Sequence, residues 1–334
     1  MTQTMVPRDT AITDQIQNGA VIRLESPGML AVSGADARSF LQAQLTQDVA
    51  AATNAQWTLA GYCNPKGRLL GLCTVVQSDA GFLLLTRRDL LDTLLPRLRM
   101  FVLRSKVTIE DVSDQHGMLG VIGEGPLQRL EETVGSMPEG PRAIHHAGDL
   151  LVLNQPGDSR RQLVIGPTAQ ISELEASLLG DTEAGAESLW SLMDIRAGLP
   201  VVTSETRESF VPQQVNLELI DGVNFKKGCY PGQEIVARMH YLGKPSRRMY
   251  RLRVPMAEQV PAPGDSVTAG DGKSAGDVVI AAPGPDGPEL LVVLKAAFAD
   301  RQDLQVAGAP AEIASLPYAV STGEAEETER QAPQ

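Results

Sequence analysis

The sequence is poor in aromatic residues and has no closely paired cysteines. Only 4% of its 334 residues are aromatic, so a flat cofactor ring would be held mainly by aliphatic side chains and a few polar groups. No C-x-x-C pair occurs, which excludes a zinc knuckle and a self-contained site in which four thiolates hold an iron–sulfur cluster. The three cysteines are Cys63, Cys73 and Cys229.

Histidine is scarce as well. His145 and His146 are adjacent, so they do not face together on a helix or strand, and His116 and His240 stand alone. We expect no metal site and no catalytic triad built on histidine.

The chain also lacks an excess of positive charge and any long apolar run. Its formal net charge of −12 opposes sequence-independent nucleic-acid binding, which needs a basic surface, and adhesion to an anionic membrane. No stretch of about 18 apolar residues occurs, so no membrane span is expected. An odd number of cysteines without a secretory signal or transit peptide fits a reducing compartment, and we expect a cytoplasmic protein.

Residues 20–115 are predicted to form a first α+β module. Two short strands over residues 21–32 would turn at Ser26-Pro27-Gly28, and Asp36 would cap a helix that begins at Ala37. A β-β-β-α-β order follows, with strands over 57–63, 69–76, 82–86 and 106–110 and a helix over 89–98.

A second α+β module is predicted over residues 116–245, and the two modules could be interwoven. It contains strands at 150–153 and 162–165 and a helix over 190–197. From Met249 onward, short strands alternate with Pro/Gly turns, which is typical of a small antiparallel barrel. We therefore predict an α+β region over 1–245, a β-barrel domain over 246–320 and a disordered polar tail over 321–334.

The most informative segment is Phe225-Lys226-Lys227-Gly228-Cys229-Tyr230-Pro231-Gly232-Gln233-Glu234. Pro231 favours the start of a helix, and Ile235, Val236 and Met239 follow at helical spacing. Cys229 would then lie near the positive end of a helix dipole, with Lys227 beside it, and both features favour a reactive thiolate. The alternative is a small hydrophobic residue packed in a turn, which is the commoner fate of a single cysteine.

Residues 227–234 resemble the K-G-C-Y-x-G-Q-E signature of the YgfZ-type folate-binding proteins, which are relatives of the glycine-cleavage T-protein. Weaker matches extend the resemblance over roughly residues 20–300. They are Phe40-Leu41-Gln42, Thr46-Gln47-Asp48-Val49, Asn64-Pro65-Lys66-Gly67-Arg68, Leu103-Arg104-Ser105-Lys106-Val107 and Phe210-Val211-Pro212-Gln213.

The resemblance implies α+β modules that enclose a folate pocket, with the C-terminal barrel closing over it. It implies tetrahydrofolate or a folate derivative as cofactor, and a role in assembly or repair of iron–sulfur enzymes, including those that methylthiolate tRNA. Folate and these client enzymes would be the partners, without direct nucleic-acid binding. Cys229 would be the essential group, and Lys227 would stabilise its thiolate or bind an anionic group of the ligand.

A folate needs polar edges for its pterin ring and positive charge for its glutamate tail. Tyr230 could pack on the pterin or simply on the core, and Arg247 or Arg248 could assist Arg238 at the tail. Glu234 and Arg238 are four residues apart and could instead form an ion pair on the helix. The predicted folate-binding residues are Asn216, Tyr230, Gln233, Glu234 and Arg238.

Two departures from the T-protein pattern bear on catalysis. The T-protein carries an aspartate shortly after its N-x-x-G turn, and we align that position with Gly71. Its R-x-E-A-G segment is matched here by Asp194-Ile195-Arg196-Ala197-Gly198, with Arg196 in place of the glutamate. Both changes disfavour aminomethyl transfer, which needs carboxylates to manage protons and charge.

Two other functions remain open from the sequence. One is a folate-dependent one-carbon transferase or demethylase. The other is a scaffold for client proteins that does not use its thiol.

Overall fold

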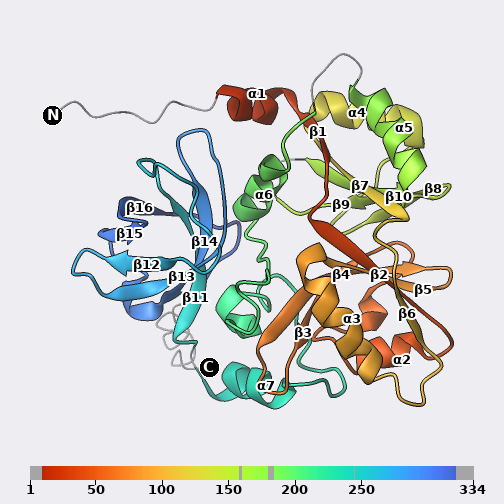
Figure 1. The fold of residues 1–334 in the computed structure, drawn as a ribbon, viewed down its shortest axis with the longest axis horizontal. Coiled ribbons are helices and arrows are strands. Elements are labelled where there is room, and N and C mark those ends of the chain that lie inside the picture. The colour runs from red at the N-terminus through yellow and green to blue at the C-terminus, as the bar shows by residue number, and fades with distance from the viewer. Residues whose placement is uncertain (1–9, 158–159, 180–183, 244, 321–334) are drawn as a thin grey trace, which may run out of the picture.

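The computed structural model describes residues 10–157, 160–179, 184–243 and 245–320. These residues form two five-stranded antiparallel sheets and a closed six-stranded barrel, with helix α6 (Glu187–Arg196) between the sheets and the barrel (Figure 1). This arrangement confirms the predicted α+β fold with a C-terminal barrel. The predicted tail over 321–334 lies outside the described residues.

The first sheet has the order β3-β4-β5-β2-β6. The order β-β-β-α-β predicted along the chain is confirmed, since α3 (Leu91–Met100) lies between β5 and β6. Asp36 precedes α2 (Ala37–Gln42) as predicted, but its carboxylate accepts from the Lys106 amide at 2.7 Å instead of capping the helix. The strands are β2 (Pro27–Ser33), β3 (Thr58–Cys63), β4 (Leu69–Ser78), β5 (Gly81–Arg87) and β6 (Thr108–Asp111).

The second sheet has the order β1-β7-β10-β9-β8, and α4 (Glu124–Val134) and α5 (Thr168–Leu179) cover its outer face. The hairpin predicted over residues 21–32 is wrong, because β1 pairs with β7 whereas β2 pairs with β5 and β6. The chain passes from the second sheet to the first between β1 and β2, and two hydrogen bonds fix this crossing. The Leu24 N–H donates to the Met118 carbonyl of β7, and the Ser26 N–H donates to the Glu187 carboxylate of α6. The strands are β1 (Ala20–Arg23), β7 (His116–Ile122), β8 (Ile144–Ala147), β9 (Leu150–Asn154) and β10 (Arg161–Pro167).

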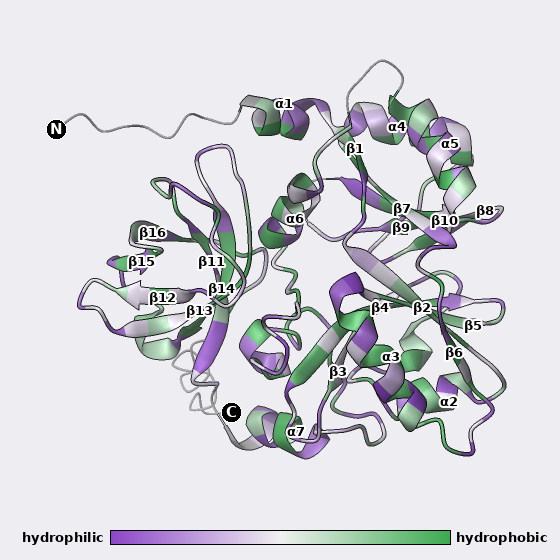
Figure 2. Cartoon of the chain, in the orientation of Figure 1, coloured by the Kyte–Doolittle hydropathy of each residue, from purple (hydrophilic) through white to green (hydrophobic). Residues whose placement is uncertain are grey.

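The barrel is closed in the order β11-β14-β13-β12-β15-β16. Strand β14 is buried along almost its whole length, because Val292 faces the barrel interior while Leu291 and Val293 pack against the main core. Figure 2 shows this strand as a continuous hydrophobic stretch. The strands are β11 (Arg247–Arg253), β12 (Ser266–Ala269), β13 (Ser274–Ala282), β14 (Glu289–Lys295), β15 (Leu304–Val306) and β16 (Ala309–Ala314).

A buried ion network joins α6 to the barrel. Glu289 of β14 accepts from Arg196 of α6 at 2.6 Å and from Arg251 of β11 at 2.5 Å. Burial alone would raise the pKa of Glu289, but the two arginines outweigh it and hold that pKa below its usual value. Arg196, which stands where the T-protein pattern has a glutamate, therefore bonds to the barrel.

We predict that Glu289→Gln lowers the free energy of unfolding by about 3–5 kcal/mol, because it leaves buried arginine charge without its partner. The control Asp277→Asn breaks the half-exposed pair with Arg247 and should cost less than about 1 kcal/mol. Denaturant unfolding measures both. Since the pKa of Glu289 is lowered by folding, the advantage of the wild type should shrink as pH falls below about 4.3. Equal losses in the two variants would contradict a special role for the network.

Candidate functional site

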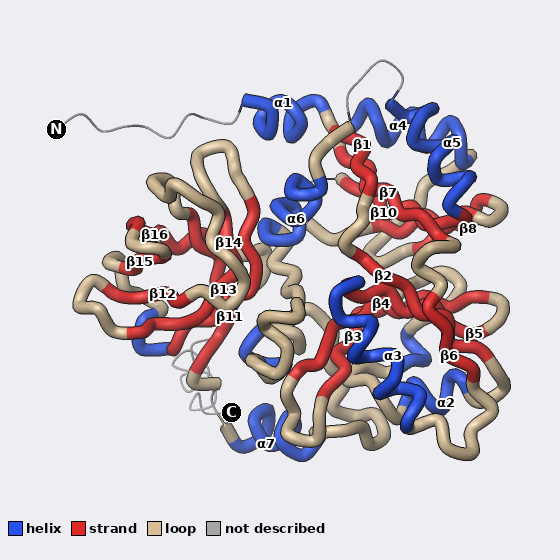
Figure 3. Tube along the Cα trace, in the orientation of Figure 1, coloured by secondary structure: helices blue, strands red, loops and turns tan. Residues whose placement is uncertain are grey.

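The segment between α6 and α7 (Gln233–Leu242) is almost entirely loop, and it lies between the first sheet and the barrel (Figure 3). Asn216 fixes its middle. This residue is fully buried in a left-handed conformation (φ 56°), and its amide donates to the Met249 carbonyl at 2.8 Å and accepts from the Met249 N–H at 3.3 Å. Both edges of the Asn216 amide are thus bound to the start of the barrel instead of facing a ligand.

Residues 225–232, here called the signature loop, pack on the turn that joins β3 to β4. Gly232 has φ +79°, and a Cβ at this position would lie 2.5 Å from the Asn64 carbonyl oxygen and from the Gly67 backbone. Only glycine therefore allows this approach without strain. The contact brings together two segments that both carry the family resemblance, the signature and the Asn64-Pro65-Lys66-Gly67 turn. The α7 start predicted at Gln233 is confirmed.

Lys227 turns into the protein. Its ammonium donates to the carbonyls of Gln42 at 2.6 Å, Leu45 at 2.5 Å and Gln47 at 3.1 Å. Burial lowers the pKa of Lys227 to about 8, with Asp48 opposing the shift. Among the described residues, no hydrogen bond joins Lys227 to Cys229.

Cys229 is exposed, whereas Cys63 and Cys73 are buried. Burial raises the pKa of both buried thiols to about 12, so these two are inert by comparison. Tyr230, next to Cys229, is buried and its ring lies 5.4 Å from the Lys227 ammonium. Burial raises the pKa of Tyr230, and the nearby Cys63 raises it by a smaller amount.

The remaining predicted folate-binding residues lie on α7. Gln233 is half-buried, while Glu234 and Arg238 are exposed and, in the described part of the chain, form no ion pair with each other. Arg247 and Arg248 are already paired, with Asp277 and Glu218 respectively. The structure therefore groups Cys229 and Lys227 on one loop but does not gather the predicted ligand-binding residues around a single pocket.

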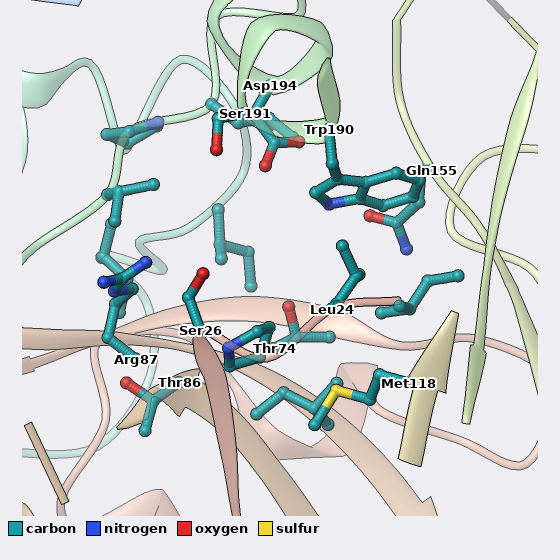
Figure 4. A pocket seen from close by; sticks show the side chains of 18 of the residues that line it. Leu24, Ser26, Thr74, Thr86, Arg87, Met118, Gln155, Trp190, Ser191 and Asp194 are labelled. Carbon is teal, nitrogen blue, oxygen red and sulfur yellow. The ribbon is translucent and has the colours of Figure 1, made fainter. Parts of the chain in front are cut away.

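A cavity of about 180 Å³ lies elsewhere, between the inner faces of the two sheets and under α6. Figure 4 shows Trp190, Ser191 and Asp194 pointing into it from α6, and Thr74 and Met118 from the strands below. Ile280 of the barrel completes its wall. Both tryptophans of the chain, Trp57 and Trp190, line it.

The cavity carries one buried ion pair. Asp194 Oδ1 lies 2.8 Å from Arg161 Nη1, and the Arg161 guanidinium lies 4.8 Å from the centre of the Trp190 ring. Burial raises the pKa of Asp194, and the attraction of Arg161 only partly offsets it. A carboxylate, an indole ring and the Gln155 amide thus line one cavity, whose wall also carries Arg87, Arg142 and Glu187 beside its apolar side chains.

Gly71, the position that we align with the T-protein aspartate, does not line this cavity. A Cβ on Gly71 would point at Leu94 and Leu90, on the side of β4 away from the cavity. The neighbours that face the cavity from β4 are Leu72 and Thr74, because side chains alternate along a strand. Neither of these two residues carries a carboxylate.

None of the predicted site residues lines this cavity in the described part of the chain. Sequence reasoning missed Trp190, Asp194 and Gln155. The sequence does contain one signal: Asp194 begins the segment 194–198, which differs from the T-protein pattern at Arg196. Among the described residues, no group of histidine, cysteine or acidic side chains could hold a metal ion, and no helix is long and apolar enough to cross a membrane.

Comparisons with known proteins agree on one family. The chain is 33% identical over 276 residues to the tRNA-modifying protein YgfZ of Klebsiella pneumoniae (strain 342), which covers 81% of this chain and 83% of that protein. It is 28% identical over 311 residues to the protein of the same name from Colwellia psychrerythraea, over 91% and 94% of the two chains. No family model matches.

The fold is that of the glycine cleavage system aminomethyltransferase T from Bartonella henselae. The superposition has a TM-score of 0.75 and covers 92% of this chain and 88% of that one. The sequence identity is only 16%, so this likeness establishes the architecture alone.

We predict that Gly232→Ala destabilises the protein by roughly 2–4 kcal/mol, since it combines a left-handed conformation with a backbone clash. Gly228→Ala is the matched control, because a Cβ there meets nothing within 4 Å. Thermal unfolding of both variants measures the difference. If Gly232→Ala is as stable as the control, the packing of the loop on the β3–β4 turn is not required.

Proposed function

This chain belongs to the family of the tRNA-modifying protein YgfZ, and from that membership we propose that it binds a tetrahydrofolate in the cavity under α6 and acts through Cys229. The process it serves is the assembly or repair of iron–sulfur enzymes, among them those that methylthiolate tRNA. The client enzymes and folate are its partners in this proposal, and the cytoplasm is its compartment.

The cavity supports a pterin-sized ligand. Its volume is below the ~300–1,000 Å³ of typical small-molecule sites, so it suits a bicyclic ring better than a whole folate. Trp190 supplies an aromatic wall, and the Asp194 carboxylate, one oxygen of which is already paired with Arg161, could accept a further hydrogen bond from a pterin N–H group. The single observation that carries the proposal is that an indole and a carboxylate line the same partly enclosed cavity.

The exposure of the Cys229 thiol is compatible with a reaction on a protein partner. Cys229 is exposed on the signature loop, where a protein can reach it. Leu59 of β3 lines the cavity, and Asn64, in the turn directly after β3, is five positions further along the extended chain, which corresponds to about 17 Å. Folate and thiol would therefore act at opposite ends of the β3–β4 hairpin.

One observation favours a second candidate, a folate-dependent one-carbon transferase or demethylase. Asp194 faces the cavity with a raised pKa, and such carboxyl groups can serve in proton transfer. Turnover of a methylamine-type substrate by the purified protein with tetrahydrofolate would support this candidate over the first.

We expect the wild-type gene to restore iron–sulfur-dependent tRNA methylthiolation in a strain lacking this protein, and Cys229→Ala to fail at matched expression. Cys73→Ala is the control, because that thiol is buried and inert. A cluster-independent tRNA modification serves as internal standard. If deletion leaves methylthiolation untouched, the maturation role is wrong. If Cys229→Ala restores it fully, the protein acts without its thiol, as a scaffold would.

We predict that tetrahydrofolate quenches the tryptophan fluorescence, because both tryptophans line the cavity. Asp194→Asn should weaken binding about tenfold or more, since hydrogen bonds to a charged group contribute about 1.5–3 kcal/mol. Because the pKa of Asp194 is raised, wild-type affinity should also fall on acidification before an ordinary aspartate would titrate. The control Asp149→Asn changes an exposed carboxylate on the second sheet's rim. Equal affinity in both variants would place folate elsewhere.

A further inference from the structure

The three hydrogen bonds of the Lys227 ammonium indicate a role apart from chemistry at the thiol. We infer that Lys227 is a positioning residue, which binds the signature loop to residues 42–47 and thereby fixes Cys229 at the surface. The inference rests on the proposed function only in taking Cys229 as the functional group.

The donors of Lys227 are fully used. An ammonium has three N–H donors and no acceptor, and here each donor meets a backbone carbonyl, at 2.6, 2.5 and 3.1 Å. No donor remains for a thiolate or for a ligand carboxylate. The Tyr230 ring lies 5.4 Å from the same nitrogen and covers it further. Lys227 would have to break existing bonds before it could contact the thiol or a ligand.

The same two segments are joined at other points. The Asn224 N–H donates to the Thr46 carbonyl at 3.0 Å, and the Thr46 hydroxyl donates to the Gly222 carbonyl at 2.7 Å. The Gln47 amide donates to the Asp221 carbonyl at 2.7 Å. Residues 221–227 are thus bound along residues 42–47, and Lys227 makes the last of these contacts before Cys229.

The loop is fixed on the other side of the thiol as well. Tyr230 is buried, and Gly232 packs on the Asn64–Gly67 turn. Between these fixed points only Gly228 and Cys229 are exposed, and a Cβ on Gly228 would meet nothing within 4 Å. The loop therefore presents the thiol on a short tip, both ends of which are held, and Lys227 holds the first end.

The test compares Lys227→Met with Lys226→Met, which removes the adjacent exposed lysine. We expect Lys227→Met to speed amide hydrogen exchange over residues 225–232 at least tenfold and to impair rescue of methylthiolation, while Lys226→Met does neither. Lys227→Met should also change the rate of Cys229 alkylation at a fixed pH more than Lys226→Met does, because it alters the position of the loop as well as removing a charge. A changed alkylation rate with unchanged exchange would overturn the inference and make Lys227 a direct partner of the thiol.

Thr46→Val provides a second, independent variant. It leaves Lys227 intact but removes the hydroxyl that donates to the Gly222 carbonyl and accepts from the Gly61 N–H of β3, so it should reproduce the faster exchange and the loss of rescue. If Thr46→Val speeds exchange yet rescues fully, loop position is not what function requires, and the inference falls. Exchange and alkylation need neither folate nor tRNA, so failure of the proposed function in the methylthiolation assay would leave these two results standing.

Discussion

Two ion pairs join α6 to the second sheet and to the barrel. Toward the second sheet, Asp194 pairs with Arg161 of β10 at 2.8 Å; toward the barrel, Arg196 pairs with Glu289 at 2.6 Å. Asp194 and Arg196 are two positions apart on α6, so a shift of the helix toward either side would break one of the two pairs. Because α6 also supplies Trp190 to the cavity, these pairs fix the roof of the candidate folate site. These pairs fix the position of α6 more than they add to the stability of the fold, because breaking a buried ion pair costs several kcal/mol even where forming it contributes little net free energy.

The signature loop shows a different means of fixing position. Backbone carbonyls bind the Lys227 ammonium, and Gly232 and Gly67 bring two turns into contact. Such contacts depend on main-chain atoms, which substitutions on the receiving side do not remove. The residues that must be kept are therefore the donor Lys227 and the glycine Gly232, whereas Gly228 meets no such restriction in the structure.

Much of the fold could be predicted from the sequence, because alternating apolar residues and Pro/Gly turns act locally. The strand order of the first module and the helix at Gln233 are examples. The predictions that were wrong involve contacts between residues far apart in the sequence. The placement of β1 in the second sheet, for example, depends on Met118 and Glu187. The cavity was missed for the same reason, since Trp57, Asp194 and Ile280 come from three distant segments. The partners of Lys227 are carbonyls, which no sequence pattern marks.

The separation of cavity and thiol limits how they can influence each other. One connection is the β3–β4 hairpin, which carries Leu59 and Thr74 at the cavity and Asn64 and Gly67 under the signature loop. The other is the loop after α6, whose residues 199–202 line the cavity and which continues to Cys229. The two connections are themselves joined, because the Leu69 N–H of β4 donates to the Phe210 carbonyl and the Glu208 N–H donates to the Leu69 carbonyl, each at 2.8 Å. The hairpin is paired along its length, and Asn216 binds the loop to the barrel at Met249. The hairpin, the loop and the barrel therefore form one hydrogen-bonded frame between the cavity and the thiol.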